Sequence, residues 1–346
     1  MEKVRFGVVG AGGIARRRTI REVQKYAQYG EIVALMDVDA KVLEETAREF
    51  GIERTFTDLP SLLKEDIEAV YVASPVYAHH EEVMAALQDG KHVLCEKPLA
   101  LNRKQAEEMA EFAEKMELRL GVGYMMRYNV YHREIKRMIG EGILGQPVAG
   151  RAQLTCWYPP IPSAWRQVKA LGGGGALMDM GGHCIDLLEW FLGETEAVFG
   201  LLDTIVHNYE VEDTATVVLK FKNGAQGIVD NYFNVPDRAA RNLLEIYGTK
   251  GAVFAENTIG QDGRGRLFLC EDFAEGYDAA QKRQEVGYRK IDLVPEPLYA
   301  REVDAFSLWI REGRKPEIAA EIGIQNLAVI EAVYQSSQEG KLVSLV

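Results

Sequence analysis

Three residues have side chains that could perform acid–base chemistry on a hydroxyl group: Lys97, Asp179 and His183. Lys97 is the second-last residue of the stretch "HVLCEKP", in which Pro98 removes a backbone donor and keeps the preceding residue out of helical geometry. Two interpretations fit this pattern. The stretch is a strand that ends in a solvated turn, or it is a buried strand that aims a lysine into a cleft.

Asp179 and His183 are four residues apart in "GALMDMGGHCIDLLEWF" (175–191), so on an α-helix they would be neighbours one turn apart. A carboxylate beside a histidine fixes its tautomer and supports its charged form as a general base. Four glycines, 172–175, precede the helix and let a ligand or backbone come close. The alternative is an ordinary amphipathic helix with one wet face.

A third motif is typical of dinucleotide binding. Gly10-x-Gly12-x-x-Ala15, which includes Gly13 and Ile14, follows the first apolar run and opens a helical pattern. Glycines there allow a tight turn, and the helix N-terminus stabilises a pyrophosphate. Asp37 ends the next apolar run, where an acidic residue would bind the adenosine ribose. Alternatively Asp37 could be the N-cap of the following helix, although Asp39 is better placed for that role.

The residues around Asp37 favour NAD as the cofactor and make NADP less likely. A carboxylate repels a 2′-phosphate, and Val38-Asp39-Ala40 offer no cationic partner for one. The basic run 16–18 could reach a phosphate, but a solvated helix face is the simpler interpretation.

The elements that must position these residues fall into two groups. In the first third, apolar runs at 4–10, 32–37, 69–74, 92–96 and 118–124 alternate with helical patterns at 14–28, 40–50, 78–89 and 102–117. This predicts a Rossmann fold, a doubly wound parallel sheet, over residues 1–123. Beyond it, strand-like runs and an Asn-Gly turn in "KNGA" (222–225) predict an α+β domain, 124–346, with an open and mainly antiparallel sheet. A final helix is expected over roughly 320–338.

Composition narrows the class of protein. The net charge is −12 and no long basic run occurs, so we expect neither nucleic acid nor an anionic membrane surface as a partner. We expect a cytoplasmic protein, because no signal peptide or spanning segment is evident. The four cysteines are far apart, and His79, His80 and His132 form no ligand spacing, so no metal is expected.

Four stretches together resemble the Gfo/Idh/MocA family, which includes glucose–fructose oxidoreductase and inositol dehydrogenase. They are "GAGGIA", "CEKP", "GYMMRYN" (123–129) and "GGGGALMDMGGHCIDLL" (172–188), and they occur in the family order across both domains. The resemblance implies an NAD(P)-dependent oxidoreductase acting on a sugar, polyol or related hydroxyl compound. It also implies a catalytic group of Lys97, Asp179 and His183, with Lys97-Pro98 as a cis peptide.

The same resemblance implies further cofactor or substrate contacts by Ser74, Pro75, His79, Glu96, Lys97, Arg127, Trp165 and Arg166. One departure is Ser74-Pro75-Val76, where relatives often have Thr-Pro-Asn; this puts an amide contact to the cofactor in doubt.

We expect His183 to take a proton from the substrate hydroxyl, Lys97 to donate a hydrogen bond to that oxygen, and Asp179 to orient His183. The alternatives are a catalytically silent dinucleotide-binding sensor and an NAD-dependent glycosidase that uses transient oxidation. A homo-oligomer, dimer or tetramer, is expected through the open sheet face.

Overall fold

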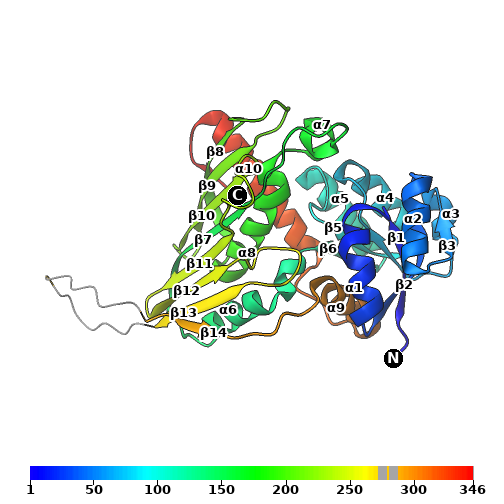
Figure 1. Ribbon diagram of the computed structural model, residues 1–346, viewed down its shortest axis with the longest axis horizontal. Coiled ribbons are helices and arrows are strands. Elements are labelled where there is room, and N and C mark those ends of the chain that lie inside the picture. The colour runs from blue at the N-terminus through cyan, green and yellow to red at the C-terminus, as the bar shows by residue number, and fades with distance from the viewer. Residues whose placement is uncertain (272–278, 280–286, 346) are drawn as a thin grey trace.

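The computed structural model describes residues 1–271, 279 and 287–345, so part of the predicted second domain lies outside the described residues. Two layered halves lie side by side, each built on its own sheet (Figure 1). The N-terminal sheet has six parallel strands in the order β3-β2-β1-β4-β5-β6. Its strands are β1 Val4–Val9, β2 Gly30–Met36, β3 Arg54–Phe56, β4 Ala69–Val72, β5 His92–Glu96 and β6 Leu120–Gly123.

This strand order is that of the Rossmann fold, so the predicted doubly wound sheet is confirmed. Short edge strand β3 is the one strand of this sheet that the apolar pattern did not indicate, since its residues are largely exposed. The helices between the strands are η1 Ala15–Thr19, α1 Ile20–Tyr26, α2 Ala40–Phe50, α3 Leu59–Leu63, α4 Val76–Gln88 and α5 Arg103–Lys115.

One helix from the C-terminal part returns to the N-terminal sheet. Helix α9, Leu298–Glu312, lies beside α1 (Figure 1). The Phe306 ring packs 6.2 Å from that of Phe6 in β1, and the Asp304 carboxylate accepts hydrogen bonds from the amides of Gln28 and Tyr29 at 2.7–3.0 Å. The first layered unit is therefore completed by residues far beyond position 123.

The C-terminal sheet has nine strands in the order β14-β13-β12-β11-β7-β10-β9-β8-β15. All neighbours run antiparallel except β7 and β10, so the prediction of a mainly antiparallel sheet is confirmed. Gly224, with φ +89°, makes the predicted Asn-Gly turn between β9 and β10. The strands are β7 Pro147–Thr155, β8 Thr195–Asp203, β9 Thr214–Phe221, β10 Gln226–Tyr232, β11 Leu243–Gly248, β12 Gly251–Glu256, β13 Arg266–Glu271, β14 Arg289–Ile291 and β15 Val343–Ser344.

Helices cover the inner face of this sheet and leave the other face open (Figure 1). Those that contact the strands are η4 Leu177–Gly181, α8 Gly182–Leu192 and α10 Ala320–Glu339. The other helices of this half are η2 Met125–Tyr128, α6 Val130–Gly140, η3 Trp165–Gln167 and α7 Lys169–Gly172. On the open face, direct cross-strand partners form a row whose two ends are apolar and whose middle is charged: Phe199, Val218, Ile228, Arg151, Glu245, Phe254 and Phe268.

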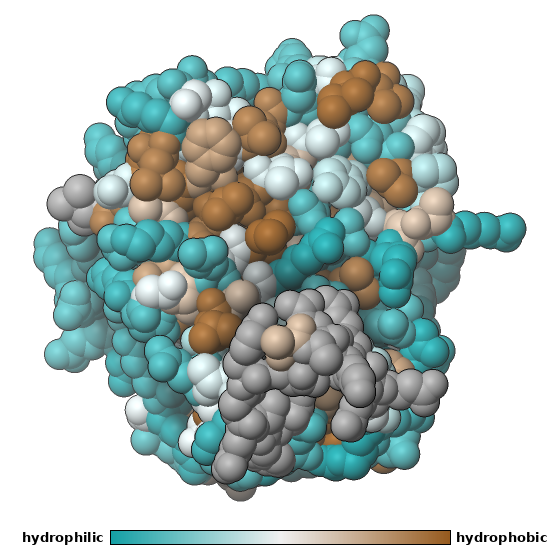
Figure 2. Space-filling view, turned by 90° about the vertical axis from the view of Figure 1, so that its left-hand side faces the viewer, coloured by the Kyte–Doolittle hydropathy of each residue, from teal (hydrophilic) through white to brown (hydrophobic). Residues whose placement is uncertain are grey.

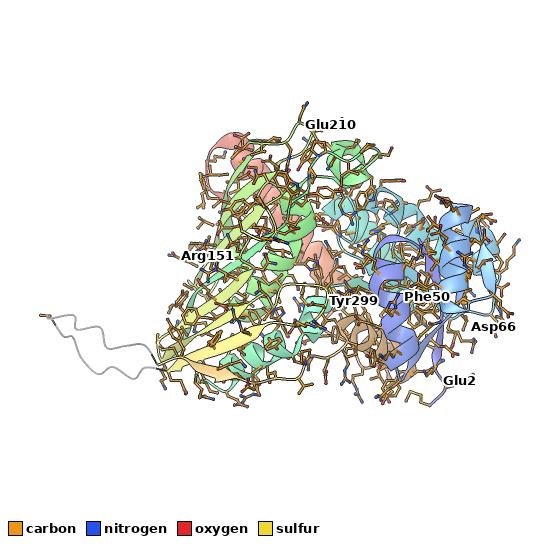
Figure 3. All side chains as sticks on the ribbon, in the orientation of Figure 1. Glu2, Phe50, Asp66, Arg151, Glu210 and Tyr299 are labelled. Atoms are coloured by element: carbon orange, nitrogen blue, oxygen red, sulfur yellow. The ribbon has the colours of Figure 1, made fainter. Side chains whose placement is uncertain are left out.

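The open face shows apolar patches interrupted by polar ones (Figure 2). Val218, Ile228 and Tyr247 stay 38–44% exposed there. Arg151, labelled at this face in Figure 3, is paired with Asp230 at 2.8 Å. The described residues include no helix long and apolar enough to cross a bilayer.

Candidate active site

The glycine motif forms the turn between β1 and η1. Gly10 has φ +83°, and a Cβ there would lie 2.6 Å from the Ser74 nitrogen on the neighbouring strand's loop. Gly13 has φ +43° and open space where a Cβ would be. The turn therefore faces the gap between β1 and β4, where the strand order reverses and where such sheets bind ligands.

Asp37 lies at this turn. Its Oδ2 accepts a hydrogen bond from the Gly12 amide at 3.3 Å, and its Oδ1 accepts one from the Asp39 amide at 2.9 Å. The N-cap of α2 is Asp39, whose carboxylate accepts from the Lys41 and Val42 amides, so Asp37 is left at the cleft wall.

The basic run 16–18 divides between two environments. Arg16 pairs with Glu45 and Glu49 at the surface, at 2.9 and 2.8 Å. Arg17 is exposed and also lines the cleft beside the glycine turn, where it could reach a phosphate.

Lys97 follows β5 directly, and the Lys97–Pro98 peptide is cis, as predicted. Its Nζ donates hydrogen bonds to the carbonyl oxygen of Asp179 at 2.5 Å and to the carboxylate Oδ1 of Asp179 at 3.1 Å. The buried Glu96 carboxylate accepts hydrogen bonds from the Tyr71 hydroxyl and from the Lys97 amide. The strand thus ends by aiming a lysine across the cleft at the second half of the protein.

Asp179 holds two cations rather than the histidine. Besides Lys97, Arg166 Nε donates to Asp179 Oδ1 at 3.2 Å, and the Arg166 guanidinium lies 4.1 Å from the centre of the Trp165 ring. Burial alone would raise the pKa of Asp179, but Lys97 and then Arg166 hold it well below its usual range. The carboxylate is therefore anionic at neutral pH.

The expectation that Asp179 orients His183 through a direct contact was wrong. Within the described residues, the buried Nδ1 of His183 has no hydrogen-bond partner. The Asp179 carboxylate is instead taken up by Lys97 and Arg166, whose nitrogens lie 3.1 and 3.2 Å from Oδ1. Burial, followed by the charge of Lys97, lowers the pKa of His183 well below its ordinary value and keeps the ring neutral.

These groups meet in one cleft of about 720 Å³ between the two halves. All the predicted site residues except Arg127 line it: Gly10, Gly12, Gly13, Ile14, Asp37, Ser74, Pro75, His79, Glu96, Lys97, Trp165, Arg166, Asp179 and His183. One end carries the glycine turn and the other the Lys97–Asp179 pair. The small, backbone-rich turn at the first end fits a dinucleotide pyrophosphate.

Two family models cover both halves of the chain. Residues 4–124 match the model described as an oxidoreductase family with an NAD-binding Rossmann fold, and residues 132–254 match the GFO/IDH/MocA C-terminal domain. The chain belongs to the GFO/IDH/MocA oxidoreductase family. The resemblance seen in the four sequence stretches is confirmed, and the protein is an NAD(P)-dependent oxidoreductase.

Relatives within the family span the whole chain. The 1,5-anhydro-D-fructose reductase of Ensifer adhaerens is 30% identical over 344 residues, covering 99% of this chain and 98% of the reductase. The myo-inositol 2-dehydrogenase of Thermotoga maritima is 30% identical over 359 residues, with 99% and 98% covered. The crystal structure of the aldose-aldose oxidoreductase of Caulobacter crescentus, complexed with glycerol, superimposes with a TM-score of 0.87 at 25% identity, covering 99% and 100% of the two chains. These relatives give no support to the sensor and glycosidase alternatives.

Arg127, although part of a stretch that carries the family resemblance, does not reach the cleft. Its guanidinium forms a buried pair with Asp186 of α8, at 2.7 Å from NH2 to Oδ1 and 3.0 Å from Nε. The guanidinium also lies 5.5 Å from the centre of the Trp190 ring. Arg127 thus fixes η2 against α8 and lies outside the residues that line the cleft.

His79 supports the cleft wall from behind. Its two ring nitrogens lie 2.9 Å from the carbonyl oxygens of Ser74 and Pro98. These carbonyls belong to the loops after β4 and β5. The buried imidazole therefore links the loop that holds Ser74 and Pro75 to the loop that holds Lys97.

Two cleft residues lie far from every motif in the sequence: Gln261 and Tyr299. Tyr299, labelled in Figure 3 between the two halves, comes from the start of α9. Only the assembled fold brings these two residues to the cleft. Among the described residues, no group of three or more His, Cys, Asp or Glu side chains is arranged to hold a metal ion.

Proposed function

We propose that this protein transfers hydride between NAD and a hydroxyl-bearing carbon of a sugar or polyol. The observation that carries the proposal is that Lys97, Asp179 and His183 share one cleft with the glycine turn of the Rossmann half. The relatives support the substrate class, because their names describe reactions on an anhydro sugar, an inositol and aldoses.

The nicotinamide of the bound cofactor supplies or accepts the hydride. Gly10, Gly12 and Gly13 would hold its pyrophosphate, and Asp37 its adenosine ribose. We favour NAD over NADP because the Asp37 carboxylate, which already accepts two amide hydrogen bonds, would repel a 2′-phosphate. Arg17 lines the same region and would balance the pyrophosphate charge.

The proton is handled by the side chains of this chain. A neutral His183 accepts the proton of the substrate hydroxyl at Nε2, because its Nδ1 is buried away from the cleft. Lys97 has three N–H donors and uses two on Asp179, which leaves one for the substrate oxygen. Asp179 orients Lys97 and Arg166.

We further propose that copies of the chain associate through the open face of the nine-stranded sheet. Exposed Val218 on β9, Ile228 on β10 and Tyr247 on β11 form an apolar surface with a charged centre at Arg151 of β7. The cytoplasm is the proposed location, since a reducing compartment suits four unpaired cysteines.

The test is a screen of purified protein against sugars and polyols with NAD or NADH, followed by the absorbance of the reduced cofactor. We expect substrate-dependent turnover that Lys97→Ala slows by roughly 10²–10³. Tight NADH binding with no turnover on any compound, in either direction, would contradict the proposal.

A further inference from the structure

The helix that carries Asp179 and His183 starts without a cap of its own. The residues before it are four glycines, and Ala176 at its N-cap makes no side-chain hydrogen bond. A helix N-terminus leaves its first amide groups without intrahelical partners, and Ser, Thr, Asp or Asn usually satisfies them. The donors at this helix start must therefore find a partner elsewhere in the chain.

One distant residue, Glu212, satisfies three successive amides of this helix start. Its carboxylate Oε1 accepts hydrogen bonds from Gly175 at 2.9 Å and from Leu177 at 3.0 Å, and its backbone carbonyl accepts one from Ala176 at 3.0 Å. Glu212 lies just before β9 and is only 8% exposed. A buried anion at the positive end of the helix dipole is a favourable arrangement.

The glycines make room for this contact. A Cβ on Gly175 would lie 2.0 Å from the Glu212 carbonyl oxygen, and one on Gly174 would lie 1.8 Å from the Tyr334 hydroxyl. Tyr334, from α10, donates its hydroxyl to Glu212 Oε1 at 3.0 Å. The close approach that Gly174 and Gly175 permit is therefore to other parts of the protein.

The hydrogen bonds continue to the reacting groups. The Asp179 amide donates to the Gly175 carbonyl at 3.0 Å, and Lys97 Nζ is bonded to Asp179. We propose that Glu212, backed by Tyr334, is a positioning residue that sets where Asp179 holds the Lys97 ammonium. This inference rests on the proposed function, in which Lys97 serves the substrate oxygen.

Three variants and two matched controls test it. Glu212→Ala removes the acceptor, and Glu212→Gln keeps an oxygen for the two amides. Glu189→Ala is the matched control, because the Glu189 carboxylate lies at the other end of the same helix. It accepts hydrogen bonds from the Thr195 backbone amide and the Gln325 side-chain amide, both at 3.1 Å. Tyr334→Phe deletes the supporting hydroxyl, and Tyr128→Phe is its control, since the buried Tyr128 hydroxyl has no partner among the described residues.

We expect Glu212→Ala to lower kcat by about 10- to 100-fold, the size of effect that an ångström-scale misplacement produces, with NADH affinity unchanged. Glu212→Gln should recover most of the rate, and Tyr334→Phe should lose less than Glu212→Ala. Glu189→Ala and Tyr128→Phe should keep the wild-type kcat, measured well below each variant's melting temperature. A Glu212→Ala kcat equal to that of Glu189→Ala overturns the proposal.

A second readout does not need turnover. The rate of reductive methylation of Lys97, measured by mass spectrometry of its peptide, should rise several-fold in Glu212→Ala and stay at the wild-type rate in Glu189→Ala. If the wild-type protein turns over no sugar or polyol, the proposed function fails, while the Lys97 labelling rate still decides the positioning role. Equal labelling in Glu212→Ala and wild type overturns that role.

Discussion

Lys97 is the residue on which the chemistry depends most directly. Replacing it with alanine removes the donor that stabilises negative charge on the substrate oxygen, so we expect kcat to fall by roughly 10²–10³. NADH affinity, measured by fluorescence titration, should change little, because the glycine turn lies at the other end of the cleft.

Lys91→Ala is the matched control. Lys91 lies directly before β5, whereas Lys97 lies directly after it. The Lys91 Nζ donates a hydrogen bond to the Ile67 carbonyl at 3.1 Å. Near-normal kcat in Lys97→Ala would remove the lysine from the mechanism.

Asp37 governs which cofactor the cleft accepts. Asp37→Ala removes the charge that opposes a 2′-phosphate, so we expect the NAD-over-NADP preference in kcat/KM to shrink by the equivalent of ~1–3 kcal/mol. Asp39→Ala, which loses only the α2 cap, should destabilise the protein without changing the preference. Wild-type protein that uses both cofactors equally well would contradict this assignment.

Which site residues could be identified from the sequence depends on how far apart in the chain the interacting residues lie. The glycine turn and "CEKP" are short local motifs, so their residues could be identified directly. Arg127 was misassigned because its partner, Asp186, lies 59 positions away, and nothing near either residue indicates the pair. Glu212 was missed for the same reason.

At the scale of single elements, apolar patterning was a better guide than side-chain spacing. The apolar runs predicted β1, β2, β4, β5 and β6 well, because buried parallel strands are nearly continuous apolar segments. The contact expected between Asp179 and His183 failed because the Asp179 carboxylate pairs with Lys97 and Arg166, which lie 82 and 13 positions away in the sequence.

Helix α6 provides a pH-dependent element. His132 is fully buried, with its ring nitrogens 2.9 Å from the Met126 carbonyl and 3.0 Å from Thr258 Oγ1, and burial lowers its pKa to about 4. In the unfolded chain the His132 side chain binds a proton near pH 6.5. The stability that the buried, neutral ring contributes is therefore fully present above pH 6.5 and is lost as the pH falls toward 4.

We therefore expect the free energy of unfolding to drop by about 2 kcal/mol more between pH 7.5 and pH 5 in wild type than in His132→Gln. Urea unfolding at the two pH values measures this difference. The control His80→Gln changes a surface histidine paired with Glu108 and should keep the wild-type pH dependence. The same pH dependence in His132→Gln and wild type would show that His132 is not responsible.

At the scale of the whole molecule, the open sheet face is the surface on which assembly depends. Ile228→Glu places a charge at the middle of that face, 43% exposed in the single chain, and should convert the oligomer to monomers in light scattering at micromolar concentration. Val294→Glu changes an apolar residue that is 82% exposed in the segment between β14 and α9, outside the strands, and should leave the mass unchanged. A wild-type monomer under these conditions would contradict the proposed interface.

The return of α9 to the first sheet has a consequence for biosynthesis. Gly30 and Gly121 are packed so closely against Val303 and Phe306 that a Cβ at either position would lie within 3.0 Å of the helix. The face of the N-terminal sheet that α9 covers is therefore bare while the ribosome adds the roughly 190 residues between the end of β6 and the end of α9. At about 5–20 residues per second, that interval lasts roughly 10–40 s. During it the nascent nucleotide-binding half exposes an apolar surface, which makes it a candidate client for chaperones at the ribosome.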